Sequence, residues 1–192
     1  GQKHLLGSGK PIRLMIENDT PSSFILWGPP GTGKTTIARI IANQTKAEFF
    51  QINAVSSGVR DIRSVIEIGA QNKNFGKRTI LFIDEIHRFN KAQQDALLHS
   101  IESGVLILIG ATTENPSFEV IPALRSRTRV FVLDELSREE LVEILNSALT
   151  KDEFLKQLNI KSIDEDYLIY LSGGDARIML TILEIIIKIS LI

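Results

Sequence analysis

The residues with the clearest chemical potential form a glycine-rich loop, Gly28-Pro29-Pro30-Gly31-Thr32-Gly33-Lys34-Thr35. The loop matches the pattern G-x-x-x-x-G-K-[ST], in which glycines let the backbone approach a phosphate and successive N–H groups form an anion-binding nest. Lys34 would place a cation on the β- and γ-phosphates of a nucleotide, and the hydroxyl of Thr35 would bind Mg²⁺. The apolar run Phe24–Trp27 precedes the loop and a helical segment, Thr36–Ala42, follows it, as the pattern requires. The residues predicted to bind ATP are Pro30, Gly31, Thr32, Gly33, Lys34, Thr35 and Thr36.

Two adjacent carboxylates, Asp84 and Glu85, follow the apolar run Ile80–Ile83. The carboxyl end of a strand is where a parallel sheet presents groups to a ligand. Asp84 suits Mg²⁺, directly or through water, and Glu85 suits the task of orienting and deprotonating an attacking water. A strand end can carry one acid for solvation alone, but two acids downstream of a phosphate loop favour a functional pair. Glu85 matters most, because it distinguishes a nucleotide hydrolase from a nucleotide kinase, which needs no water activator.

Five short apolar runs, rich in β-forming residues, are expected to be strands. They are Phe24–Trp27, Glu48–Ile52, Thr79–Ile83, Val105–Ile109 and Arg129–Leu133. Because they lack strict alternation and helical segments lie between them, they predict a parallel five-stranded sheet covered by helices on both faces. After Leu133 only helices are expected, at about 138–150, 164–172 and 176–190, the first opened by the capping box Ser137-Arg138-Glu139-Glu140. The fold class is therefore α/β, with an ATPase core at 1–133 and a small all-helical lid at 134–192.

Charge is divided unevenly along the 192 residues, although the net charge is only −1. Residues 1–133 carry 16 basic and 11 acidic side chains, whereas residues 134–192 carry 6 and 12. The net value therefore does not exclude a nucleic-acid partner, and the opposite signs suggest two units with different tasks. The absence of cysteine excludes disulfides, thiolate zinc sites and cysteine nucleophiles. His4, His87 and His99 are too scattered to suggest a metal-ligand set, and each is expected to be a surface or hydrogen-bonded histidine.

The two ends of the chain show neither a targeting signal nor a membrane span. The chain opens on Gly1, and no apolar segment with a cleavage site follows, so no signal peptide is predicted and an excised piece of a longer protein is expected. Ile178–Ile192 is apolar almost all round, but it is shorter than the roughly 18 residues a span needs and contains charged residues. We expect it to be a buried helix, and we expect no membrane partner.

The motifs together resemble the AAA+ ATPases, whose P-loop core carries a Walker A loop, a Walker B strand and a helical lid. Within that group the chain is similar to the replication-associated recombination protein A (RarA/MgsA) family, which includes the eukaryotic Werner-helicase-interacting ATPases. The strings that carry the closer resemblance are Gly58–Arg63, Asp84–Asp95 and Gly110–Glu119. The last contains Thr112-Thr113-Glu114-Asn115-Pro116-Ser117-Phe118-Glu119, which is specific to the family. The resemblance runs from Gly1-Gln2 to Leu183-Glu184.

The resemblance implies roles for several further residues. Thr113 would be the sensor that contacts the γ-phosphate, with Asn115 as a second candidate. Arg127, in Leu124-Arg125-Ser126-Arg127-Thr128, would be the arginine finger that reaches a neighbouring subunit, although Arg125 leaves the choice of arginine open. Arg177, in Gly174-Asp175-Ala176-Arg177, would be the lid residue that contacts the same nucleotide. Arginine suits these tasks because phosphoryl transfer spreads negative charge over three oxygens. From the residues alone, two alternatives remain open: a solvated basic edge for Arg125, Arg127 and Arg129, and a salt bridge from Arg177 to Asp175 or to another acid of the lid.

The same resemblance implies an ATP-hydrolysing module of a DNA-associated protein that acts in replication-fork maintenance, recombination and repair. The implied cofactors are ATP and Mg²⁺, and hydrolysis would be stimulated by DNA in the full-length oligomer. The implied partners are further copies of the chain, DNA at forks or single-strand/double-strand junctions, and replication proteins such as single-stranded DNA-binding protein. The location would be the cytoplasm of a bacterium or the nucleus of a eukaryote. A clamp-loader subunit, a Holliday-junction branch-migration motor and a non-hydrolysing nucleotide-switch scaffold remain as alternatives.

Overall fold

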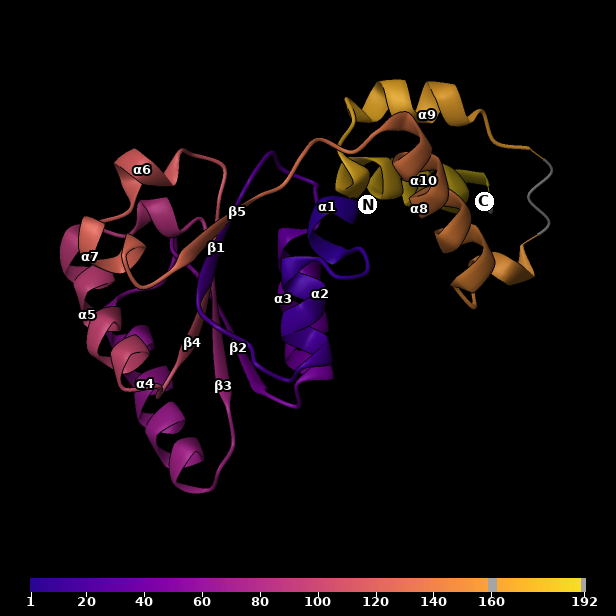
Figure 1. Ribbon diagram of the computed structural model, residues 1–192. Helices are drawn as coiled ribbons and strands as arrows, with labels where there is room; N and C mark the ends of the chain where they lie inside the picture. Colours follow the sequence, from indigo (N-terminus) through magenta and orange to yellow (C-terminus); the bar gives the residue numbers. More distant parts are fainter. Residues whose placement is uncertain (159–161, 191–192) are drawn as a thin grey trace. The chain divides into compact units, whose positions relative to one another are not determined.

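The computed structural model of the chain describes residues 1–158 and 162–190 (Figure 1). Its backbone contacts divide the chain into two compact units. The first, the α/β unit, comprises Gln2–Gly28 and Gly33–Leu133. The second, the helical unit, comprises Gly1, Pro29–Thr32 and Asp134–Ile192.

A five-stranded parallel sheet forms the centre of the α/β unit. Its strands are β1 (Phe24–Trp27), β2 (Glu48–Asn53), β3 (Thr79–Asp84), β4 (Ile107–Thr112) and β5 (Arg129–Val132). Their order across the sheet is β2-β3-β4-β1-β5, so β4 lies between the strand before the glycine-rich loop and the strand that ends in Asp84. The predicted parallel α/β sheet is confirmed.

The fourth strand differs from its predicted range. It begins at Ile107 rather than Val105, because the N–H groups of Val105 and Leu106 both donate to Ser100 O, at 2.9 and 3.0 Å. These two bonds close the end of the preceding helix, so neither N–H can join the sheet at that point. At its other end the strand continues through Gly110 and Ala111 to Thr112. The strand end therefore places a threonine, not an isoleucine, at the carboxyl edge of the sheet.

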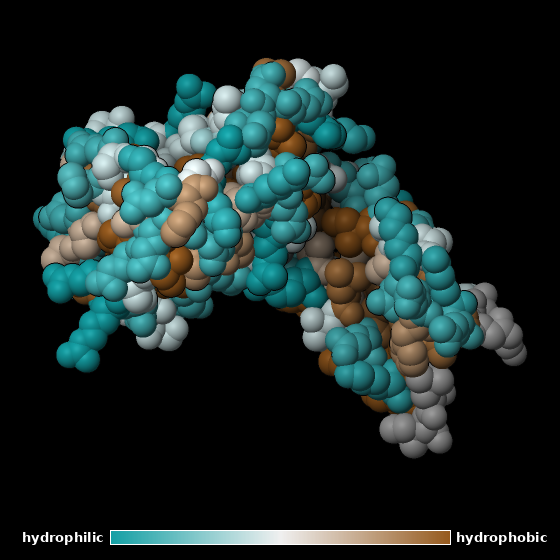
Figure 2. Space-filling model, turned by 90° about the horizontal axis from the view of Figure 1, so that it is seen from below, coloured by the Kyte–Doolittle hydropathy of each residue, from teal (hydrophilic) through white to brown (hydrophobic). Residues whose placement is uncertain are grey.

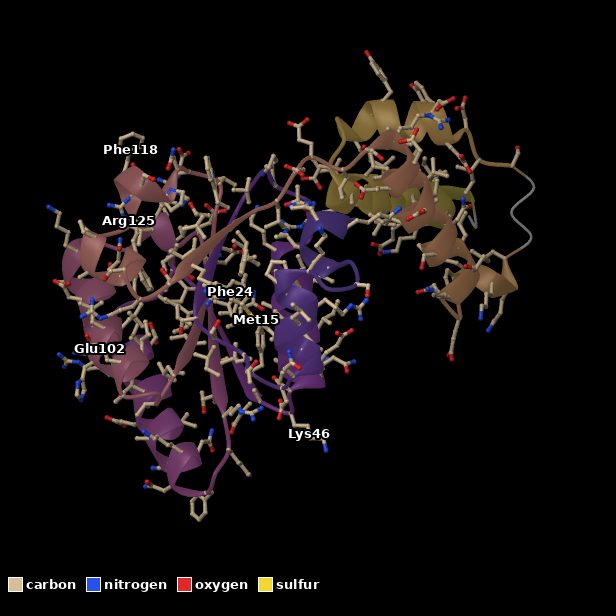
Figure 3. The ribbon with its side chains drawn as sticks, in the orientation of Figure 1. Met15, Phe24, Lys46, Glu102, Phe118 and Arg125 are labelled. Atoms are coloured by element: carbon tan, nitrogen blue, oxygen red, sulfur yellow. The ribbon has the colours of Figure 1, made fainter. Side chains whose placement is uncertain are left out.

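Helices cover both faces of the sheet, as Figure 1 shows. One face carries α1 (Lys3–Leu6), α2 (Pro11–Glu17) and α3 (Lys34–Gln44), and the other carries α4 (Val59–Asn74), α5 (Lys91–Glu102) and α7 (Pro122–Arg125). Alternate residues of the central strands enter the two cores: Ile80 and Phe82 pack in one, and Leu81 and Ile83 in the other. Strands buried on both faces read as continuous apolar runs, which explains the absence of alternation. In Figure 3, Phe24 of β1 and Met15 of α2 mark the first of these cores.

Phe82 offers a test of the first core, since its side chain is 0% exposed and its ring stacks on Phe49 with centroids 6.2 Å apart. Phe82→Ala is expected to lower the free energy of unfolding by about 3–5 kcal/mol, because it removes a large apolar side chain and leaves a cavity. The matched control is Phe75→Ala, because Phe75 is 80% exposed and its loss should cost less than about 0.5 kcal/mol. Urea denaturation of both variants measures the difference. Equal costs would contradict the packing described for Phe82.

The helical unit packs three helices around a small core of its own. They are α8 (Arg138–Lys151), α9 (Glu165–Ser172) and α10 (Ala176–Ser190), with a short 3-10 helix at Leu155–Gln157. The predicted capping box opens α8: Glu140 N–H donates to Ser137 Oγ at 3.2 Å, and Ser137 N–H donates to Glu140 Oε2 at 3.1 Å. The buried core residues are Leu141, Leu145, Leu168, Ala176, Met179, Leu183 and Ile187.

Among its described side chains, helix α10 is buried on one face only, so the expectation of a buried helix is correct for that face and wrong for the rest. Met179, Leu183 and Ile187 face the core, whereas Ile185 and Ile189 are 51% and 66% exposed. The physical reason is that helices α8 and α9 line one side of α10. Figure 2 shows hydrophobic side chains at the surface of this unit. The last two residues of the predicted apolar run, 191 and 192, lie outside the described residues. Among the described residues, none of the helices has the length and apolar character needed to cross a membrane.

Candidate functional site

The glycine-rich loop joins β1 to α3 and is shaped by its glycines. Gly31 and Gly33 have φ values of 73° and 95°, in the left-handed region that side chains disfavour. A Cβ placed on Gly33 would meet no atom within 4 Å, so the backbone faces open space there. The hydroxyl of Thr32 donates to Pro29 O at 2.9 Å and holds the turn closed. Helix α3 begins directly after Gly33, so its first N–H groups belong to the loop and favour a bound anion.

Lys34 is a nearly buried cation at the start of α3, with 8% of its surface exposed. Its ammonium group donates to Gly28 O at 2.7 Å. A buried charge is stable only with acceptors or counter-charges around it, and the phosphates of a nucleotide supply both. Gly28 itself lies against the backbone of Leu133, since an added Cβ would come within 2.4 Å of Leu133 O. The buried cation, the left-handed glycines and the helix N-terminus together fit a nucleoside triphosphate.

The acid pair lies at the carboxyl end of β3. Asp84 is in register with Asn53 of β2 and is half-buried. Glu85 follows it with φ 55° and ψ 45°, a left-handed conformation that costs a non-glycine residue about 1–3 kcal/mol and is concentrated at functional sites. This turn directs the chain into a single 3-10 turn, Ile86–Arg88, whose Ile86 is fully buried. The Glu85 side chain stays 30% exposed, which a group that meets water requires.

The end of β4 lies beside this pair. Thr113 Oγ1 donates to Glu85 Oε2 at 3.5 Å, which brings the predicted sensor to the predicted base. Gly28 N–H donates to Thr112 O at 3.2 Å, so the start of the glycine-rich loop is attached to the same strand end. Asn115, the second sensor candidate, instead uses Oδ1 to accept the Ser117 N–H at 2.9 Å and caps helix α6 (Pro116–Glu119). The structure thus places Thr113, and not Asn115, in contact with Glu85.

The sequence-based prediction did not include two residues of this edge, His87 and Thr112. His87 is a hydrogen-bonded histidine, as expected, but its position 3.3 Å from Glu85 Oε2 was not predicted. The same nitrogen lies 2.9 Å from Oγ1 of Thr112, which is fully buried. The sequence feature that could have indicated a role for His87 is its position two residues after the proposed base.

A metal ion at this edge would depend on the nucleotide for part of its coordination. No group of three or more His, Asp or Glu side chains is arranged to hold a metal ion within residues 1–158 and 162–190. Mg²⁺ characteristically takes one or two protein ligands and completes its octahedron with phosphate oxygens and water. The hydroxyl of Thr35 and the carboxylate of Asp84 are the side chains that fit such a site.

The candidate finger arginines lie on the opposite side of the sheet from Met15. Figure 3 labels Arg125 of α7 and Glu102 of α5 on that side. Arg127 forms an ion pair with Glu102 and donates to Ala123 O at 2.7 Å, while its side chain stays 36% exposed. Arg125 differs, because its Nε is buried without a hydrogen-bond partner among the described residues. Of the two, Arg127 presents the guanidinium that is both oriented and accessible.

Arg177 is the second residue of α10. Asp175 Oδ1 accepts the N–H groups of Arg177 and Ile178 at 2.7 and 3.1 Å, so this carboxylate caps the helix. Both bonds come from backbone N–H groups, so they do not involve the Arg177 guanidinium. Among the described residues, the exposed Arg177 guanidinium makes no ion pair.

The glycine-rich loop, the acid pair and the sensor strand fall within one family model. The model for the ATPase family associated with various cellular activities (AAA) matches residues 24–136, more than half of the chain. The chain belongs to the AAA family. The expected AAA+ core is confirmed, and ATP hydrolysis is the activity for which this family is named.

Relatives narrow the comparison within the AAA family. The chain is 50% identical over 192 residues to replication-associated recombination protein A of Escherichia coli K12, an alignment that covers 96% of this chain and 42% of that protein. It is 46% identical to ATPase WRNIP1 of Dictyostelium discoideum, covering 98% of this chain and 22% of that protein. The chain spans less than half the length of these curated relatives. The resemblance to the RarA family is thereby confirmed.

A solved structure supports the same fold. The RuvB Holliday junction branch migration motor of Thermotoga maritima superposes with a TM-score of 0.72 at 29% identity. The match covers 94% of this chain and 60% of that one. The likeness to this structure therefore extends over almost the whole chain.

Proposed function

We propose that this AAA chain is the ATP-hydrolysing module of a DNA-associated protein that acts in replication-fork maintenance, recombination and repair. The observation that carries the hydrolytic part is the contact between Glu85 and Thr113, 3.5 Å apart, at the same sheet edge as the buried Lys34. A nucleotide-binding protein that only assembled partners would not need a water-activating carboxylate there. The names of the relatives, replication-associated recombination protein A and WRNIP1, support the cellular setting. That setting implies the bacterial cytoplasm or a eukaryotic nucleus.

Each group at the edge has a defined task in the proposed reaction. The loop N–H groups and Lys34 bind the β- and γ-phosphates and offset the charge that develops on them. Mg²⁺, which Thr35 and Asp84 would hold, supplies a further positive charge on the same phosphates. Glu85 accepts a proton from the attacking water, whose oxygen bonds to the γ-phosphorus as the bond to the β,γ-bridging oxygen breaks. The Thr113 hydroxyl donates either to Glu85 or to the γ-phosphate, so it senses which phosphates are present.

Two arginines complete the proposed chemistry. Arg127, exposed at the surface beside Glu102, is proposed to donate to the γ-phosphate bound by a neighbouring copy of the chain. Arg177 is proposed to contact the nucleotide from the helical unit, a role that the family resemblance alone supports. Both assignments imply a homo-oligomer, with DNA at forks or strand junctions and single-stranded DNA-binding protein as further partners. The RuvB likeness, at 29% identity, favours a branch-migration motor as the second candidate function.

The proposed function is tested by steady-state phosphate release from the protein at its full natural length, with and without forked DNA. We expect many turnovers per site and a rate that rises with DNA, and we expect Lys34→Ala to abolish both. Absence of turnover with intact ATP binding would contradict hydrolysis and favour a nucleotide-switch scaffold. A rate indifferent to DNA would contradict the DNA-linked part. ATP-driven movement of a four-way junction would favour the branch-migration motor.

A further inference from the structure

A series of close polar contacts connects the ends of β3 and β4, and its central member is a histidine. Nδ1 of His87 lies 3.3 Å from Glu85 Oε2 and 2.9 Å from Thr112 Oγ1. The His87 side chain is 7% exposed, whereas that of Glu85 is 30% exposed. The imidazole is therefore an internal group whose Nδ1 side faces the proposed base.

The fold holds His87 in this place. It is the middle residue of the 3-10 turn Ile86–Arg88, between Ile86, which is fully buried, and Phe89, which is 3% exposed. Both apolar side chains belong to the core that also contains Ile83 of β3 and Leu108 of β4. The turn is thus anchored on both sides of His87, which leaves its ring little freedom.

A count of protons determines which ring nitrogen carries hydrogen. The Thr112 hydroxyl accepts Glu114 N–H at 3.0 Å and donates its single proton to Glu114 O at 3.1 Å. It can therefore only accept from His87, and an ionised Glu85 can only accept as well. Were Nδ1 without a proton, its lone pair would face the carboxylate of Glu85 at 3.3 Å. Nδ1 consequently carries a proton, which it donates to Thr112 Oγ1 while its N–H also faces Glu85 Oε2 at 3.3 Å.

We propose that His87 is a positioning residue that orients Glu85 for its reaction with water and couples it to the sensor strand β4. The proposal rests on the proposed role of Glu85 as the base. Both the His87 N–H and the Thr113 hydroxyl approach Oε2, so Oε1 is the oxygen left, among the described contacts, to accept the proton of the water. A glutamate side chain has up to about 2 kcal/mol of rotamer entropy, and a base must be held close to its reacting geometry. His87 supplies that restraint. Because Thr112 lies at the end of β4, directly before Thr113, its bond to His87 links the orientation of Glu85 to the position of that strand end.

Three substitutions at position 87 test the proposal in the protein at its full natural length. His87→Ala is expected to lower kcat by about tenfold to a hundredfold, the range seen when a residue that supports a functional group is lost. The Kd for a fluorescent ATP analogue should stay within about twofold, because His87 does not contact the phosphates. His87→Asn should restore most of kcat, since its amide nitrogen occupies the place of Nδ1. His87→Gln should not restore kcat, because its amide nitrogen lies as far along the side chain as Nε2 of histidine and not at the place of Nδ1.

The comparison of variants separates positioning from simple structural support. A kcat for His87→Ala within about twofold of wild type overturns the proposal, and so does equal activity of the asparagine and glutamine variants. If the alanine variant does not fold, the asparagine–glutamine pair alone decides between these results. The melting temperature of each variant shows whether a loss of activity follows a loss of stability. If kcat and the melting temperature fall equally in the asparagine and alanine variants, the positioning role is contradicted.

A double variant keeps this proposal distinct from the assignment of the base. Glu85→Gln with His87→Ala should have the same residual rate as Glu85→Gln alone, because His87 acts through Glu85 and the two losses do not add. Additive losses would overturn the positioning role. If Glu85→Gln by itself keeps its turnover, the base assignment fails. If Glu85→Gln is inactive while His87→Ala is fully active, only the positioning proposal fails.

Discussion

Glu85→Gln is expected to reduce ATP turnover by about 10²- to 10⁴-fold while leaving ATP binding nearly unchanged. The amide has the shape of the carboxylate and can still accept the Thr113 hydroxyl, but it does not take a proton from water. The phosphate-binding groups, Lys34 and the loop, are untouched. Steady-state phosphate release measures the first effect, and titration with a fluorescent nucleotide measures the second.

The control is a second glutamate-to-glutamine change in the same unit. Glu119 lies exposed at the end of α6, so Glu119→Gln removes the same charge and should keep turnover within about twofold. A Glu85→Gln rate close to that of Glu119→Gln would remove Glu85 from the role of base. A parallel loss of nucleotide affinity would instead assign Glu85 to binding.

Much of the fold follows from the sequence because burial on both faces leaves a plain signal. The residues of β1 and β3 are almost all fully buried, so their apolar runs identify them as inner strands. The start of β4 could not be predicted in this way. Val105 and Leu106 have the composition of a strand, but their N–H groups close the end of α5, and that competition is visible only in three dimensions.

The residues of the site likewise fall into those that local sequence patterns predict and those that they do not. The glycine-rich loop and Asp84-Glu85 are local patterns in which residue type and spacing already define the chemistry, so the sequence is sufficient to predict them. His87 and Thr112 are 25 residues apart, and their contact exists only because β3 and β4 pair in one register. The ion pair of Arg127 with Glu102 likewise spans 25 residues. Contacts of this kind depend on the packed sheet, which no local pattern specifies.

Mixing two inactive variants is expected to restore ATPase activity if Arg127 acts on a neighbouring subunit. Arg127→Ala should lower the rate by about 10³- to 10⁵-fold, since an arginine finger contributes that much to phosphoryl transfer. Lys34→Ala should be equally inactive, because its own loop no longer holds the phosphates. In a ring assembled from both, a site with intact Lys34 can lie next to a subunit with intact Arg127. Roughly one interface in four of a random equal mixture has this arrangement, and it should hydrolyse ATP.

Two further measurements make the complementation decisive. Lys34→Ala mixed with the double variant Lys34→Ala/Arg127→Ala contains no complete site and should stay inactive at every ratio. Arg125→Ala is the matched arginine control, because Arg125 has a buried Nε and lacks the accessible orientation of Arg127. Its activity should stay within a few fold of wild type. No rescue at any mixing ratio would mean that each site is completed within one subunit, and an inactive Arg125→Ala beside an active Arg127→Ala would transfer the finger role to Arg125.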